Sequence, residues 1–202
     1  MTKKKSFEDA LNTPFRWPSR GDQPFSINRA PDENARIAGD GFTRLVLMVE
    51  GYKKAADLMV KRTVEDWRER DFLVFPIIFN YRHFVELSLK YLLATYGHGV
   101  NIAPNWNSHD LEVLWSDFRK MLCRYGIDNP DEVDSVVASI ILNYSKVDSR
   151  SFSHRYPVDR EGKTLPVAQS ELDLENLADV MNAVANYFTG TDGYLNSLEN
   201  SC

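Results

Sequence analysis

Cysteine is scarce in this sequence of 202 residues, where only Cys123 and Cys202 occur. So few cysteines exclude a disulfide framework and are typical of a reducing compartment, so we expect a cytoplasmic protein. Histidine is also rare, and its spacing lacks the paired ligands of a zinc ribbon or an HExxH helix. The sequence therefore predicts no metal and no cofactor. The histidines are His83, His98, His109 and His154.

Long apolar runs are absent as well. The longest stretches, at 45–49 and 72–79, are much shorter than the roughly 20 apolar residues that a membrane-spanning helix needs. At the N-terminus, three lysines are followed by acidic and polar residues instead of an apolar segment, so we expect no secretory signal. These features predict a protein that does not cross a membrane.

A surplus of positive charge is also missing, because the net charge is −5. A molecule of this charge repels a polyanion at long range, which disfavours extended binding to a nucleic-acid backbone. A small local basic site stays compatible with this charge. Such a site could hold an RNA phosphate or a nucleotide.

Residues 1–38 contain four of the nine prolines among mixed polar residues, and this composition cannot sustain a long helix. The segment is predicted to be an extended N-terminal arm. Because it also carries Phe15, Trp17 and Phe25, we expect it to pack against the rest of the chain or a neighbouring subunit.

Residues 39–202 are predicted to form one helical domain. Apolar residues recur there at steps of three and four, the period of one buried helical face. Asn107 or Ser108 is expected to cap the third helix, Asn129 or Asp131 to open the fourth, and Ser170 with Asp173 to form a capping box for the last. The predicted helices span 41–70, 71–96, 108–125, about 129–147, and 170 to a point between 189 and 193.

Between 148 and 169 the helical period is lost, and residue types alternate around a DREGK turn. This pattern favours a short β-hairpin or paired extended segments. Helices with single apolar faces bury them best in an antiparallel bundle. The predicted fold is mainly α: four to five helices with a short β-hairpin or extended insertion before the last one.

Three charged residues of the second helix, Arg82, Glu86 and Lys90, are spaced by four and therefore share one face. One interpretation is a solvated ladder of ion pairs, which would contribute only a few tenths of a kcal/mol per pair. However, the neighbouring residues are strongly apolar on most of the circumference. The alternative interpretation places the three in a groove or an interface, as binding residues.

Two stretches, YRHFVELSLKYLL and SHDLEVLW, resemble the helix pair of many prokaryotic HEPN domains, a superfamily that includes ribonucleases and inert interaction modules. In these domains the second helix opens with a His-Asp-Leu triplet, which here is His109, Asp110 and Leu111. The later segment SFSHRYPVDREG is similar to one found in a subset of these proteins, so the resemblance covers about residues 40–190. We interpret His109 and Asp110 as fold markers at a helix N-terminus, where an acidic residue complements the dipole.

Active members of this superfamily carry an arginine and a histidine separated by four to six residues. The nearest match is Arg150 and His154, with three residues between them. The resemblance implies that the arginine holds an RNA phosphate while the histidine moves a proton, without a metal. A helix would place the two about 6 Å apart along its axis, and an extended chain about 13 Å. Arg155 is another candidate phosphate ligand.

Two hypotheses follow from the resemblance. The first is a catalytically degenerate or regulatory module that dimerises and binds a partner, with Arg82, Glu86 and Lys90 along a groove. A toxin–antitoxin or phage-defence setting would supply an antitoxin or another protein as that partner. The alternative is a metal-independent ribonuclease that uses Arg150 and His154, and a two-fold dimer could bring these two residues together across subunits. The wider spacing in active members and the acidic charge favour the first hypothesis.

Overall fold

The computed structural model describes residues 16–128, 131–147, 157–159, 161–165 and 170–200. The chain divides into two units, residues 1–37 and residues 38–202. In the first unit, the described residues contain one short 3-10 helix, η1 (Pro31–Glu33). The side-chain amide of Asn34 folds back on this turn and donates to the carbonyl oxygens of Asn28 and Ala30.

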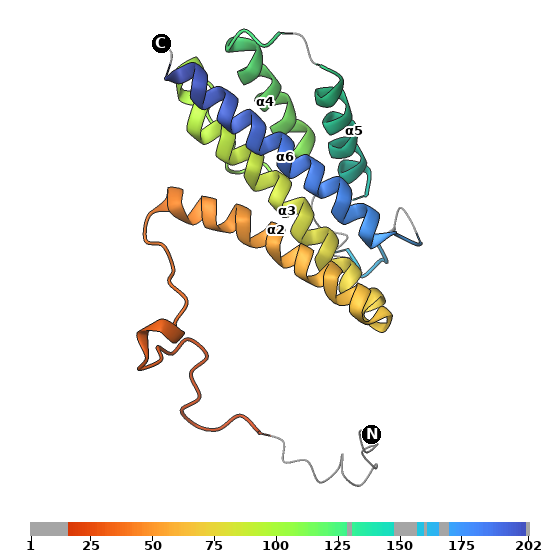
Figure 1. The fold of residues 1–202 in the computed structure, drawn as a ribbon. Helices are drawn as coiled ribbons and strands as arrows, with labels where there is room; N and C mark the ends of the chain where they lie inside the picture. The colour runs from red at the N-terminus through yellow and green to blue at the C-terminus, as the bar shows by residue number, and fades with distance from the viewer. Residues whose placement is uncertain (1–15, 129–130, 148–156, 160, 166–169, 201–202) are drawn as a thin grey trace. The chain divides into compact units, whose positions relative to one another are not determined.

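The second unit is a helical bundle (Figure 1). The described residues form five α-helices and no strand, which confirms the predicted helical-bundle fold. The short 3-10 helix η2 joins α2 to α3, and a second one, η3, follows α3. The elements are α2 (Gly41–Glu65), η2 (Trp67–Glu69), α3 (Arg70–Tyr96), η3 (Gly97–Val100), α4 (Leu111–Arg124), α5 (Glu132–Val147) and α6 (Leu174–Glu199).

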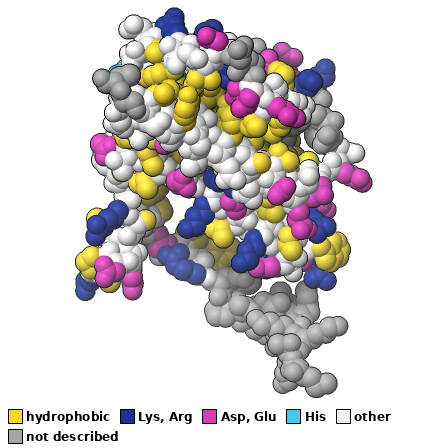
Figure 2. All heavy atoms as spheres, turned by 45° about the horizontal axis from the view of Figure 1, so that its top comes forward, with side chains coloured by type: hydrophobic (Ala, Val, Ile, Leu, Met, Phe, Trp, Pro, Cys, Tyr) yellow, Lys and Arg dark blue, Asp and Glu magenta, His cyan; other side chains and the backbone are white. Residues whose placement is uncertain are grey.

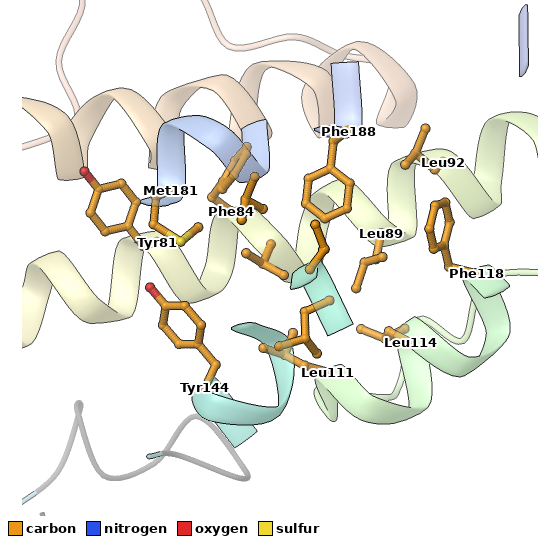
Figure 3. Close-up of a cluster of buried hydrophobic side chains, with 14 of the residues drawn as sticks. Tyr81, Phe84, Leu89, Leu92, Leu111, Leu114, Phe118, Tyr144, Met181 and Phe188 are labelled. Carbon is orange, nitrogen blue, oxygen red and sulfur yellow. The ribbon is translucent and has the colours of Figure 1, made fainter. Parts of the chain in front are cut away.

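Helix α3 is the centre of the bundle and packs against α2, α4 and α6. It is apolar on almost every side, as expected for a helix surrounded by others. Figure 3 shows its side chains meeting those of α4, α5 and α6 in the core. The labelled core residues are Tyr81, Phe84, Leu89, Leu92, Leu111, Leu114, Phe118, Tyr144, Met181 and Phe188.

The segment Trp67–Val100 is long and apolar enough to cross a membrane by length and composition alone. More than half of its apolar window is buried inside the bundle, and the core helix of a soluble protein gives the same pattern. Pro76 lies inside α3. The helix begins at Arg70, directly after η2.

Aspartates cap α2, α4 and α6, and two of the predicted caps are wrong. Asp110 caps α4 in place of Asn107 or Ser108, because its carboxylate accepts from the amides of the second and third helical residues. Asp173 caps α6 in the same way, so it does not act as the third residue of a box opened by Ser170. Asp131, one of the two predicted openers of α5, accepts from the Asp134 amide.

Helix α6 also continues beyond its predicted end between 189 and 193, through Gly190 and Gly193 to Glu199. Each glycine costs about 1 kcal/mol in a helix interior. The final turns offset this cost because Leu195 is completely buried in the core and Tyr96 donates its hydroxyl to the Asp192 carboxylate at 2.8 Å. Tertiary packing therefore overrides the local helix-ending signal.

The predicted β-hairpin is not shown by the structure. In the segment 148–169, the described residues are 157–159 and 161–165, and they contain no strand. A single antiparallel bridge pairs Val158 with Thr164. The chain turns between them at Gly162, whose φ of 81° suits glycine.

Candidate functional site

Three charged residues of α3 lie inside the bundle. Arg82 and Glu86 are 1% exposed, and Lys90 is 3% exposed. Arg82 Nη1 donates to Glu86 Oε2 at 3.2 Å, and Lys90 Nζ donates to Glu86 Oε1 at 2.9 Å. The solvated ladder is therefore wrong, because the three side chains form a buried ion cluster. The binding role of these residues stays a prediction.

The loop between η3 and α4 covers this cluster. Arg82 Nη2 donates to the backbone carbonyl oxygen of His109 at 2.6 Å, and Lys90 Nζ donates to that of Trp106 at 3.3 Å. Buried cations need acceptors for their remaining protons, and the two carbonyl groups supply them. The cluster thus fixes the end of the loop against α3.

The side chain of His109 completes the cluster from the surface. Its Nδ1 lies 2.9 Å from Glu86 Oε1, although 63% of the His109 side chain is exposed. Glu86 is thus shared by three partners on two segments of the chain, because Arg82 and Lys90 come from α3 and His109 from the loop. We call Arg82, Glu86, Lys90 and His109 the Glu86 cluster.

Glu86 is ionised in this setting. Burial raises the pKa of its carboxyl group, but the hydrogen bonds from Lys90 and His109 and the nearby positive charge outweigh burial and lower the pKa overall. An ionised carboxylate only accepts hydrogen bonds. The hydrogen-bond network therefore assigns the shared proton to Nδ1 of His109, so the neutral tautomer that fits this contact carries its lone pair on Nε2.

His83 lies next to the cluster without a hydrogen bond to it. Its Nδ1 is 4.0 Å from Glu86 Oε2, which is too long for a hydrogen bond. Burial lowers the pKa of His83, and its ring packs edge-on against Tyr52 and stacks with Phe79. His83 is therefore a neutral packing residue.

The predicted catalytic pair, Arg150 and His154, lies outside the described residues, and so does the predicted phosphate ligand Arg155. Their roles remain predictions. Of the predicted binding residues, the structure brings Arg82, Glu86 and Lys90 together. The contact that sequence reasoning missed joins Glu86 to His109, 23 positions further along the chain. Three charged residues within the apolar stretch of this helix were the signal that could have suggested a buried partner.

Two of the surface hollows formed by the described residues can be placed, and neither is lined by the Glu86 cluster. One lies beside the start of α6 and is lined by Thr63, Arg70 and Asp173, among others. The other, of about 320 Å³, lies along α6 and is lined partly by Tyr187 and Tyr194.

On the face shown in Figure 2, Lys and Arg side chains are interspersed with Asp and Glu.

Comparisons with protein-family models, with curated proteins and with solved structures found no match to this chain. The structure itself defines a helical bundle in which a buried carboxylate holds two buried cations and one exposed imidazole. Chemically, this arrangement can fix a loop, and it can hold a proton at a known nitrogen of His109.

Proposed function

We propose that this chain is a HEPN-like binding module that is catalytically degenerate and self-associates through the outer face of α2. The observation that carries the proposal is an apolar stripe on that face. Leu47 and Leu58 are 53% and 58% exposed, and Met48 is also exposed. Large apolar side chains that gather on one exposed helix face are typical of an interaction surface.

The stripe is distinct from the side of α2 that enters the core. Leu47, Gly51 and Leu58 follow one another at steps of four and seven and therefore share a face. Leu45 and Ala56 lie on the opposite side and are buried. Helix α2 thus exposes two leucines on a face that its contact with the bundle does not use, and Lys54 lies between them.

Gly51 supports a close helix–helix contact at this stripe. A glycine inside an exposed helix costs about 1 kcal/mol relative to alanine. No atom lies within 4 Å of the position that a Cβ at Gly51 would occupy, so no contact within the described bundle requires glycine there. A second helix could approach the backbone closely at this point.

A second copy of the chain is the occupant that suits this pattern. In an antiparallel pair of α2 helices, Leu47 of each copy can face Leu58 of the other about a two-fold axis. Gly51 and Lys54 then lie beside the axis, where the glycine allows close approach and the lysine stem covers apolar surface. The resemblance to HEPN proteins independently implies a dimer, with a protein such as an antitoxin as the further partner.

Sedimentation-velocity ultracentrifugation of the full chain tests the proposal. We expect the wild type to be a dimer at micromolar concentration and the double variant Leu47→Lys/Leu58→Lys to be a monomer with unchanged helix content. Val136→Lys on α5 is a matched control, because Val136 is 53% exposed and lies outside the stripe. A monomeric wild type, or a double variant that stays dimeric, would contradict the proposal.

The ribonuclease alternative has its own test. Purified protein is incubated with RNA in EDTA, and His154→Ala is compared with the wild type. The proposal of a degenerate module expects no cleavage by either. RNA cleavage that is lost in His154→Ala would replace it with the metal-independent ribonuclease.

A further inference from the structure

His109 is held in the way that enzymes hold a reactive imidazole. One ring nitrogen bonds a carboxylate that is only 2% exposed, while most of the ring faces solvent. A carboxylate in this position fixes both the orientation of the ring and the nitrogen that carries the proton. Because Nδ1 donates its proton to Glu86, Nε2 is the ring nitrogen that carries the lone pair in the neutral tautomer.

Charged groups also surround His109. Lys90 Nζ and His109 Nδ1 each lie 2.9 Å from the same oxygen of Glu86, so the two nitrogens are no more than 5.8 Å apart. His109 directly precedes Asp110, the N-cap of α4, and the N-terminus of a 14-residue helix is the positive end of its dipole. The Asp110 carboxylate already accepts from two amides at this end, so the ring lies among charges of both signs.

We propose that Nε2 of His109 is a phosphoryl acceptor, and that the donor is a phosphoramidate such as a phosphorylated histidine on a partner protein. The ring is presented on the surface and lines neither hollow described above. Small-molecule substrates are usually bound in concave clefts. A donor carried on another protein needs no cleft, because the partner surface brings the phosphoryl group to the ring.

The transfer uses groups that the structure and the donor supply. The lone pair of Nε2 attacks phosphorus, and a new N–P bond forms as the N–P bond of the donor breaks. The bonding electrons stay with the donor nitrogen, which takes a proton from water. Nδ1 keeps its proton, and the Glu86 carboxylate stabilises the positive charge that develops on the ring. Glu86 is therefore a positioning residue, and His109 is the residue that reacts.

Potassium phosphoramidate is a direct probe of this chemistry on the full chain. We expect intact mass to show the gain of one phosphoryl group that is lost in acid, and fragment spectra to place it on His109. His98→Gln is the matched control, because His98 is exposed and its ring contacts no carboxylate in the part of the chain that the structure describes. This variant should be labelled like the wild type, whereas His109→Gln should not be labelled.

Phosphorus NMR tests the role of Glu86 separately from folding. In the wild type we expect phosphate on Nε2 alone. In Glu86→Gln, the amide can donate or accept, so both ring tautomers are allowed and label should appear on both nitrogens, with a rate about 10- to 100-fold lower. If this variant does not fold, the position of the label in the wild type still decides the question.

Three results would overturn the inference: no labelling of the wild type under conditions that label free imidazole, equal labelling of His98 and His109, or label on Nδ1 of wild-type His109. The inference does not depend on self-association. The Leu47→Lys/Leu58→Lys variant should be labelled like the wild type, so a failure of one proposal leaves the other intact.

Discussion

Tyr187 of α6 donates a 2.5 Å hydrogen bond to Oδ1 of Asp134 on α5. Oδ2 of the same carboxylate accepts from Arg119 Nη1 of α4 at 2.8 Å, so one side chain joins three helices. Burial, reinforced by the contact with Asp134, raises the pKa of Tyr187. The phenol therefore remains a protonated donor at neutral pH, and α5 is tied to the bundle by polar contacts as well as by packing.

Asp134→Ala should lower the free energy of unfolding by about 2–4 kcal/mol, because it leaves Arg119 and the Tyr187 hydroxyl without their shared acceptor. Urea unfolding followed by circular dichroism measures the change. The matched control is Asp117→Ala, which removes an ion pair to the exposed Lys120 and should change stability by about 0.5 kcal/mol or less. Equal effects of the two substitutions would contradict the bridging role of Asp134.

Glu86 should give the protein a pH-dependent stability. The pKa of its carboxyl group is lowered in the folded state, so the contribution of Glu86 is present above the unfolded pKa of about 4.5 and is lost as pH falls through the lower folded value. At pH 7, Glu86→Gln should be less stable than the wild type. The difference should shrink as pH falls below about 4.5. Urea unfolding of both proteins from pH 7 to pH 3 measures it.

The control for this pH dependence is Glu112→Gln in the first turn of α4, at a residue that is exposed. Its difference from the wild type should vary much less with pH. A constant difference between the wild type and Glu86→Gln over the whole range would show that Glu86 is not preferentially ionised in the folded protein.

Replacing Gly97 and replacing Gly190 with alanine should change the stability of the protein in opposite directions. A Cβ at Gly97 would overlap the backbone carbonyl oxygen of Ile102, so Gly97→Ala should destabilise the fold by about 1–3 kcal/mol. At Gly190, inside α6, nothing lies within 4 Å of the added Cβ. Gly190→Ala should therefore stabilise the protein by about 0.5–1 kcal/mol. Thermal unfolding of both variants checks the signs, and the same sign for both would contradict this assignment.

The end of α6 can be tested at Leu195, whose side chain is completely buried. Leu195→Ala should cost about 2–5 kcal/mol if the last turns of α6 belong to the core. Leu142→Ala on α5 is the control, because Leu142 is 43% exposed, and it should cost much less. A small effect at Leu195, measured by urea unfolding, would indicate that the helix ends earlier.

Much of the helical pattern could be predicted because apolar periodicity is a local property of the chain. Leu111, Leu114, Phe118 and Met181 recur at helical spacing within the predicted helices, and all four are buried. Helix ends were harder to predict. Several polar residues near each start can cap a helix, and only the backbone conformation selects Asp110 and Asp173.

The candidate site was less accessible to sequence reasoning. The spacing of Arg82, Glu86 and Lys90 shows that they share a face, but spacing does not say which element covers that face. Their burial depends on the loop that ends at His109, and the contact between Glu86 and His109 spans 23 positions. Non-local contacts of this kind leave no periodic trace in the sequence.

The sequence by itself determined that this protein is a helical bundle, because single apolar faces at helical spacing can be buried only against one another. The tertiary structure decided which charges lie inside, how far α6 extends, and which nitrogen of His109 is presented to solvent. These properties depend on the environment of each residue, and elements distant in the sequence supply that environment when the chain folds.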